Sequence, residues 1–383
     1  MFLALRDLRF ATGRFALMGS VVALISLLLV MLSGLTAGLG GQNTAAIDRL
    51  GEQGVQRLVF GGAAGQEPTA SFTQSEFTVA QRDAWAATDG VASVEPLGVS
   101  QGRAIGLEHP VDTDPQRRAD VSGEPTTGVA TTAFIGLTPG GSDAPAGVEP
   151  GQIVLSQDVA DSLHAQAGDA VAVSGFVFTV ADVVPTEYYS HSPVTWLALE
   201  DWNAISHTAD DAVLGTAGLV RFDAGADVDA VAAAGDDAAG TVAETVKGSY
   251  AALPSYRSEN GSLMTIQGFL YGISVLVVIA FLSIWTVQRT RDIAVLKALG
   301  GSNGWVLKDS LAQAAFVLVG GVAVGTGLAA AIGAFAGRAV PFELSWATTA
   351  VPAAGVLVLG MLAAVVAVFR VTRIDPLVAL GGN

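Results

Sequence analysis

Residues 263–287 read LMTIQGFLYGISVLVVIAFLSIWTV, a run of 25 residues without a single Asp, Glu, Lys or Arg. Because a helix rises ~1.5 Å per residue, this run is long enough to cross the ~30 Å hydrocarbon core of a bilayer. Three similar runs lie at 15–39, 306–336 and 347–369, and the run at 306–336 has its only charges within its first four residues. The sequence therefore predicts four transmembrane helices.

The bulk composition also favours a membrane protein. Hydrophobic residues make up 51% of the chain and charged residues only 14%, whereas a soluble domain usually has about a quarter charged residues. The first run follows basic residues, as a cleaved signal peptide would. Its apolar stretch is about 25 residues long, and a signal peptide has only about 7–15, so we expect a retained helix.

Lysine and arginine indicate the orientation, because they gather in short loops on the cytoplasmic side. Nine of the nineteen basic residues flank the apolar runs in three short segments: Arg6, Arg9, Arg14, Arg289, Arg291, Lys297, Lys308, Arg370 and Arg373. The short connection between the last two runs carries only Arg338 and Glu343. We therefore expect a multi-pass protein of the cell membrane, with both termini and the loop between the second and third runs in the cytoplasm.

The long segment 41–262 carries the acidity of the chain. It holds nine basic and thirty acidic residues, a balance of −21, against −16 for the whole chain. A surface of this charge repels nucleic acid and anionic lipid, so no nucleic-acid partner is expected. The chain has no cysteine, so a hydrophobic core must hold this segment together without disulfides. We expect an extracellular α+β domain.

Short β-like runs recur through this domain, and one pair reads as a hairpin. Within 170–184, the sequence AVAVSGFVFTVADVV alternates as two strands around Ser174-Gly175. Helices are expected at 78–88, 157–164 and 228–250. The other predicted strands are 55–60, 91–99, 132–137, 153–155, 194–199 and 214–222, and the predicted loops are 61–68 and 139–150.

The chain lacks the common sequence motifs of catalysis. No GxxxxGK[ST] loop occurs, so the chain does not bind ATP through a Walker motif, and no zinc-ligand or GxSxG motif occurs either. The four histidines, His109, His164, His191 and His207, are scattered through the acidic domain and are interpreted as surface residues. We expect no catalytic site and no metal site. The spans also lack the charged residues of ion-coupled carriers, so the energy for transport must come from another subunit.

The predicted cytoplasmic loop 288–305 contains the pattern of a short amphipathic helix. Ile293, Leu296 and Leu299 are spaced by three and form one apolar stripe, and Gly300 is placed to end the helix. The polar side carries Arg291, Asp292 and Lys297. Such a helix can lie in the membrane interface, dock onto a partner, or be a loop helix without a partner.

Three segments resemble ABC transporter permeases of the MacB/FtsX type. The run TRDIAVLKALGGS at 290–302 is similar to the family signature REIGILKAIGAS, with Asp292 where Glu is commoner. The tail RIDPLVALGG at 373–382 resembles the closing segment of the family, and ALRDLR at 4–9 resembles its N-terminal helix. The order of one span, a large outer domain and three spans also matches.

This resemblance implies a homodimer of the chain bound to two copies of a separate ABC ATPase, which binds ATP and Mg²⁺. It implies that the loop helix, from Arg291 to Gly300, couples ATPase closure mechanically to the spans. Glycines four residues apart also allow helices to approach closely, either between chains or within one chain. These pairs are Gly34/Gly38, Gly268/Gly272, Gly321/Gly325 and Gly333/Gly337.

Among shorter members of the family, the chain most resembles the membrane subunits of haem exporters (HrtB-like), which makes haem the expected substrate. Met31 lies ~24 Å along the first helix, and Met264 lies near the outer start of the second. Glu259 follows just beyond, with Tyr256 and Arg257 a turn further out. Met, Tyr and carboxylate can approach haem iron, and Arg can pair with a propionate. The alternative is that both methionines face lipid and the polar cluster is an interfacial anchor.

The expected fold is a membrane protein of four transmembrane α-helices, one before and three after an inserted α+β extracytoplasmic domain. The segments are the N-terminal helix and first span 1–40, the domain 41–262, the second span 263–287, the coupling loop 288–305, the third span 306–336, the outer loop 337–346, the fourth span 347–369 and the tail 370–383. The expected function is that of the permease subunit of an ATP-driven pump that exports haem from the outer leaflet. The alternatives are an FtsX-like regulator that transports nothing, an exporter of another hydrophobic compound or peptide, and a membrane-anchored sensor.

Overall fold

The chain folds into two compact units. A computed structural model describes residues 12–63, 66–109, 118–121, 123–206, 212–288 and 303–372. The helical unit comprises the chain up to Leu39 and from Asn260 onward, and the inserted domain comprises Gly40–Glu259.

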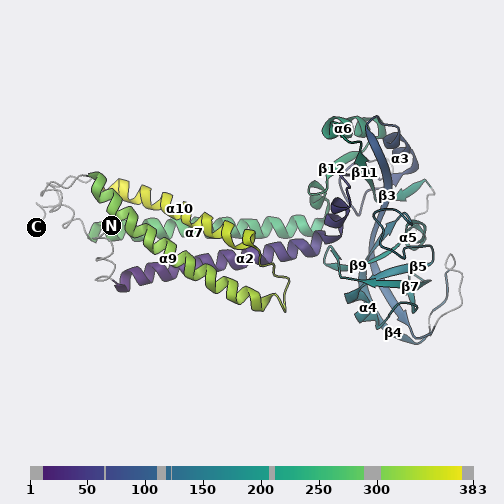
Figure 1. The fold of residues 1–383 in the computed structure, drawn as a ribbon, viewed down its shortest axis with the longest axis horizontal. Helices are drawn as coiled ribbons and strands as arrows, with labels where there is room; N and C mark the ends of the chain where they lie inside the picture. The colour runs from purple at the N-terminus through teal and green to yellow at the C-terminus, as the bar shows by residue number, and fades with distance from the viewer. Residues whose placement is uncertain are drawn as a thin grey trace, which may run out of the picture. The chain divides into compact units, whose positions relative to one another are not determined.

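Four long helices make up the helical unit (Figure 1): α2 (Thr12–Glu52), α7 (Pro254–Gln288), α9 (Asn303–Ala336) and α10 (Trp346–Thr372). Each is long and apolar enough to cross a membrane. Their facing side chains form one core, in which Val22, Val278 and Leu318 are fully buried. The end of α2 and the start of α7 belong to the inserted domain, so both helices extend beyond the apolar runs seen in the sequence.

Glycines allow the helices of this unit to approach closely. Gly325 of α9 faces α2, and a Cβ atom there would overlap the carbonyl oxygen of Ala23. Gly34 of α2 and Gly333 of α9 both leave room for the ring of Phe342, which lies in the connection between α9 and α10. Three of the four glycine pairs noted in the sequence therefore contribute to packing within the chain.

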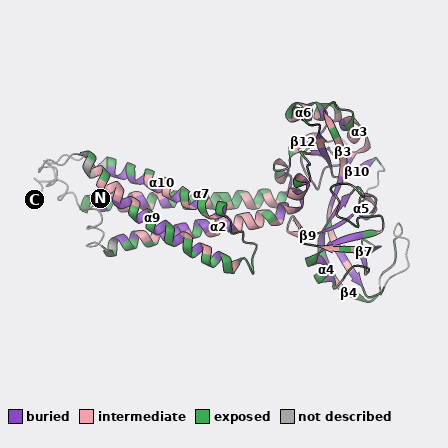
Figure 2. Cartoon of the chain, viewed as in Figure 1, coloured by how far each residue is buried: buried purple, intermediate pink, exposed green. Residues whose placement is uncertain are grey.

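Helix α7 is the least covered of the four helices. Only 17% of its most apolar window is buried, against 33–39% for the other three. Met264, Phe269 and Leu276 are all more than half exposed, and Figure 2 shows exposed residues along the helices of this unit. A Cβ atom at Gly268 or Gly272 would meet no atom within 4 Å among the described residues. One face of α7 is thus available for contact outside the protomer.

A ten-stranded sheet organises the inserted domain, in the order β12-β1-β11-β3-β4-β9-β5-β7-β6, with β8 beside β9. Its strands are β1 (Arg57–Phe60), β3 (Val91–Leu107), β4 (Thr126–Leu137), β5 (Gln152–Ser156), β6 (Ala170–Val173), β7 (Phe176–Val184), β8 (Tyr188–Tyr189), β9 (Ser192–Ala198), β11 (Ala217–Phe222) and β12 (Val242–Thr245). Strands β2 (Phe77–Thr78) and β10 (Val213–Gly215) form a separate ribbon. Because β6 also pairs with β3, the strands β3, β4, β9, β5, β7 and β6 close into a small barrel.

The long strand β3 contributes residues to several hydrophobic cores, including two that are covered by helices. Phe134, Leu155 and Phe178 are buried in the core of the barrel, which is covered by α4 (Gln157–Leu163) and α5 (Leu199–Ser206). The other part of β3 joins β11, β1 and β12. There the core is built around Trp85, and α3 (Val79–Ala86) and α6 (Val228–Ala239) pack together over it.

The structure confirms some predicted elements and corrects others. The predicted hairpin is β6 and β7, joined at Ser174 and Gly175, which both have positive φ. The helix predicted over 228–250 is wrong beyond Ala239, because Gly240 adopts the left-handed conformation and ends α6. The chain then continues as β12 and the 3₁₀ helix η1 (Gly248–Ala252).

Candidate functional site

Three elements of the inserted domain meet around Glu259, close to the start of α7. They are the end of α2, which carries Gln42 and Asn43, the first turns of α7, which carry Ser255, and the turn between β8 and β9. Asn43 is only 1% exposed, whereas 38% of the Glu259 side chain remains exposed. The Glu259 side chain is thus held by neighbouring residues and still partly exposed.

The turn between β8 and β9 consists of Ser190 and His191. Their φ angles are 47° and 62°, and positive φ at both central residues is typical of a type I′ hairpin turn, where Asn and Gly are usual. The Ser190 amide donates to the Asn43 carbonyl over 3.1 Å, and the His191 amide donates to the Gln42 carbonyl over 2.9 Å. These bonds hold the turn against α2 and direct the imidazole towards Glu259.

Hydrogen bonds from two elements converge on the Glu259 carboxylate. His191 Nε2 lies 2.9 Å from each carboxylate oxygen, and Asn43 Nδ2 donates to Oε2 over 3.2 Å. Ser255 Oγ donates to Asn43 Oδ1 over 2.7 Å, so the amide presents its NH₂ group to the carboxylate. Ser190 Oγ lies 2.8 Å from Ser255 Oγ. Asn43 Nδ2 also lies 3.0 Å from His191 Nε2, so the imidazole, the amide and the carboxylate are all in mutual contact.

Two aromatic side chains pack beside this network. The rings of Tyr256 and Tyr250 meet edge to face, with centroids 5.5 Å apart. The Tyr250 hydroxyl donates to the Asp48 carboxylate on α2, and burial together with that bond raises the pKa of Tyr250. Arg257 is exposed to solvent. Tyr256 is therefore partly used in packing, and Arg257 presents a positive charge at the surface.

Two arginines, Arg49 on α2 and Arg221 on β11, join the end of α2 to the inserted domain. Arg49 lies 3.5 Å from the Glu187 carboxylate and stacks 4.6 Å above the ring of Trp196. Burial raises the pKa of the Glu187 carboxyl, although the charge of Arg49 acts in the opposite direction. Arg221 pairs with the buried Asp143 and also donates to the Gln53 carbonyl. These contacts join the end of the helix firmly to the domain.

The residues predicted for substrate binding divide between the two units. Tyr256, Arg257 and Glu259 lie in the inserted domain, and Met31 and Met264 lie in the helical unit. Met31 is half-buried on α2, and Met264 is 62% exposed on α7. The network at Glu259 is the part of the predicted site whose geometry the structure defines.

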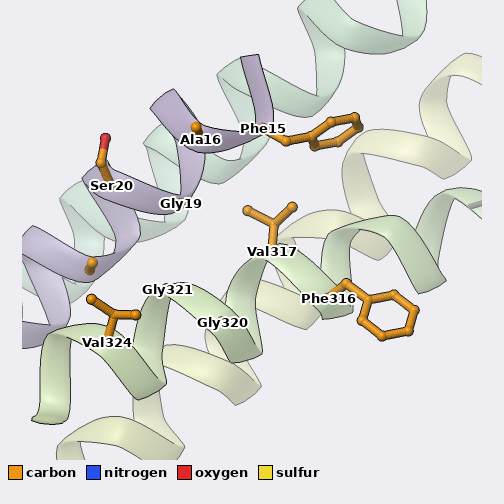
Figure 3. Close-up of a pocket in the computed structure, with 10 residues that line it drawn as sticks. Phe15, Ala16, Gly19, Ser20, Phe316, Val317, Gly320, Gly321 and Val324 are labelled. Carbon is orange, nitrogen blue, oxygen red and sulfur yellow. The ribbon is translucent and has the colours of Figure 1, made fainter. Parts of the chain in front are cut away.

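A cleft of about 510 Å³ lies between α2 and α9 in the helical unit (Figure 3). Phe15 and Gly19 line it from α2, and Phe316 and Gly320 line it from α9. The described residues that line it include no ionisable side chain and none of the predicted substrate-binding residues. It is suited to an apolar chain rather than to a charged ligand.

Other predicted features are distant from this network or lie outside the described residues. His109 and His164 are exposed, and the described residues contain no group of three or more His, Cys, Asp or Glu that could hold a metal ion. His191 is partly exposed, with 30% of its side chain accessible, and it also contacts Glu259, a partner that the sequence alone does not identify. The residues predicted to couple to the ATPase, together with His207, lie outside the described ranges: Arg291, Asp292, Ile293, Leu296, Lys297, Leu299 and Gly300.

Comparison with known families defines the class of protein. Residues 264–376 match the family described as FtsX-like permease C-terminal. The C-terminal part of the chain therefore contains an FtsX-like permease domain, the membrane domain of ABC transporter permeases, and a domain of helices and strands is inserted between the first and second candidate spans.

Its relatives include several proteins named putative hemin transport system permease protein HrtB. Two are from strains of Staphylococcus epidermidis, and each is 21% identical over the full length of both chains. A third, from Staphylococcus haemolyticus, is 28% identical over 130 residues, which cover 34% of this chain and 37% of the relative.

Two solved structures are similar to the chain over about half of its length. One is the extracellular domain of the noncanonic ABC-type transporter YknZ, from Gram-positive bacteria, which is 14% identical with a TM-score of 0.32. This match covers 48% of the present chain and 95% of the YknZ domain. The other is the periplasmic region of MacB from Actinobacillus actinomycetemcomitans, which is 11% identical with a TM-score of 0.33. This match covers 50% of the present chain and 89% of the MacB region.

Proposed function

We propose that this permease is the membrane subunit of an ATP-driven pump that exports haem from the outer leaflet of the cell membrane. A separate ABC ATPase supplies the energy by binding ATP and Mg²⁺. The full-length similarity to the hemin permeases supports haem as the substrate. The structural observation that supports it is the Glu259 carboxylate, which is held by His191 and Asn43, remains partly exposed, and lies on the same helix as the exposed Met264.

The proposed substrate site combines soft, acidic and basic groups. Met31, Met264 and Glu259 offer thioether and carboxylate ligands of the kind that haem iron accepts. Arg257 is exposed and supplies a cation for a haem propionate. Tyr256, whose ring packs against that of Tyr250, offers an aromatic surface. A site with an apolar part and a polar end suits an amphiphile whose ring is apolar and whose edge is charged.

The uncovered face of α7 supports a homodimer. Gly268 and Gly272 have open space where a Cβ atom would stand, and large apolar side chains such as Phe269 are exposed beside them. In a membrane, small residues on an open face let a second helix approach closely. We propose that two copies of the chain meet through this face and bind two ATPase subunits.

In this proposal, the termini and the loop 288–305 face the cytoplasm, as the distribution of Lys and Arg indicates. The segment 291–300 contacts the ATPase, and ATP-driven closure moves α7 and α9, which flank it in the sequence. Since α2 and α7 both continue into the inserted domain, the movement of these helices reaches the outer domain directly.

Titration with haemin in lipid nanodiscs tests the substrate. The wild-type protein is expected to shift the Soret band, and Met31→Ala, Met264→Ala and Glu259→Ala are each expected to weaken binding by about tenfold or more, equivalent to about 1.4 kcal/mol. Met361→Ala on α10 serves as the methionine control. An unchanged haemin spectrum with the wild-type protein would contradict haem as the substrate.

A further inference from the structure

We propose that His191 is a positioning residue that holds the Glu259 carboxylate in the orientation that haem meets. This inference rests on the proposed function, since it assigns His191 a role in the same site. His191 is 68 residues away from Glu259 in the sequence, yet its Nε2 atom lies 2.9 Å from both carboxylate oxygens. No other imidazole among the described residues is shown in contact with a predicted substrate-binding residue.

The backbone at His191 is specialised for this contact. Ser190 and His191 both adopt the left-handed conformation, which is unfavourable for a residue with a Cβ atom. A two-residue turn of this type would fold more readily with Asn and Gly. The chain instead keeps a histidine at the second position, and the turn amides bind the carbonyls of Gln42 and Asn43 on α2. The imidazole is therefore held by a fixed turn rather than by a mobile loop.

The polar network leaves the carboxylate few alternative orientations. The Ser190, Ser255 and Asn43 side chains form a chain of hydrogen bonds that ends on Glu259 Oε2. With these partners in place, 38% of the Glu259 side chain remains exposed. A carboxylate oriented in advance loses less conformational freedom when it binds a ligand.

The competing interpretation is purely structural: His191 ties the turn to α7 and has no effect on haem. The two interpretations differ in their dependence on Glu259. A positioning residue affects haemin binding only while Glu259 is present, whereas a structural tie affects the domain with or without that carboxylate. A double-mutant cycle therefore separates them.

The experiment measures haemin affinity and Soret position for the full chain in nanodiscs. His191→Gly removes the imidazole at a position where glycine suits the backbone. This variant is expected to bind haemin about fivefold more weakly. Its Soret band is expected to move towards that of the Glu259→Ala variant. His191→Gln restores an N–H donor and is expected to recover most of the affinity. His164→Gly is the matched control, since His164 is exposed and, like His191, adopts the left-handed conformation.

The outcomes distinguish the inference from the proposed function. In the Glu259→Ala background, His191→Gly is expected to cause no further loss. Wild-type affinity for His191→Gly, or an equal loss with and without Glu259, would overturn the role of His191 and leave haem export standing. Absence of haemin binding by the wild-type protein would overturn the proposed function and this role with it. If the glycine variant does not fold, His191→Asn replaces it, because Asn tolerates the same φ but has a shorter side chain.

Discussion

Asp201 is a buried carboxyl group near the start of α5, in the core of the inserted domain. It is only 4% exposed, and its Oδ2 atom accepts a hydrogen bond of 2.8 Å from the Gly151 amide. Burial raises the pKa of Asp201 to about 6, although the Gly151 amide acts in the opposite direction. An unfolded Asp titrates near pH ~3.9. The folded domain thus keeps this proton to a higher pH than the unfolded chain does.

Asp201→Asn is expected to stabilise the domain at neutral pH. With a raised folded-state pKa, Asp201 costs stability as the pH rises from about 4 to about 6, and the cost persists above that range. The asparagine amide removes the charge and keeps an oxygen that accepts the hydrogen bond from the Gly151 amide. The free energy of unfolding is therefore expected to rise by about 1–3 kcal/mol at pH 7.5 and by almost nothing at pH 4. Thermal unfolding of the full chain at the two pH values measures it. Asp89→Asn, at an exposed site, is the control, and a lower Tm for Asp201→Asn at pH 7.5 would refute the argument.

At the residue scale, the sequence predicts the types of side chain in the site better than their partners. Glu259 and Met264 are noticeable in the sequence because they lie at the outer start of an apolar run. His191 and Asn43 are not noticeable, because their link to Glu259 depends on a hairpin turn docking against α2. Contacts of this kind across long sequence separations depend on tertiary packing, which local patterns do not encode.

At the scale of single helices, the glycines of α9 and α7 have opposite roles. Gly325→Leu is expected to destabilise the protomer by at least about 2 kcal/mol, because the new side chain would overlap the Ala23 backbone of α2. The expected result is a lower Tm and poorer yield in detergent. A wild-type Tm for this variant would show that α2 and α9 do not pack as closely as the structure indicates.

Gly272→Leu is the matched substitution on the uncovered helix. The Cβ atom that it adds meets no neighbour within 4 Å among the described residues, so the protomer is expected to keep its Tm. The same change would obstruct a second helix on this face and is expected to shift the population from dimer to monomer. Cross-linking and mass photometry in nanodiscs measure the effect, and an unchanged dimer fraction would exclude this face as the interface.

The predicted elements differ in accuracy for identifiable reasons. The hairpin of β6 and β7 was predictable because apolar residues alternate on both sides of Ser174-Gly175. The segment 228–250 has helix-forming alanines throughout, but Gly240 ends α6 and the following residues pair with β1. The closure of the barrel through β3 and β6 depends on strand pairing between distant segments, which alternation alone does not specify.

At the scale of the whole molecule, the central claim is that ATP-driven movement of the spans exports haem. Replacing Ile293 and Leu296 with Asp would place charges on the apolar stripe of the predicted coupling helix. This double variant is expected to reduce the stimulation of the partner ATPase by about tenfold or more. Haemin affinity is expected to stay unchanged, since both substituted residues lie outside the proposed substrate site. Arg289→Ala, outside that stripe, is the control. Preserved stimulation in the double variant would remove the loop from its proposed role.

The most direct test is the ATPase activity of the purified permease–ATPase complex in nanodiscs, measured with and without haemin. We expect the two subunits to co-purify, haemin to stimulate ATP hydrolysis by the wild-type complex, and Glu259→Ala to lose that stimulation while keeping its basal rate. A stable complex whose hydrolysis does not respond to haemin would contradict haem export and favour a regulator that transports nothing.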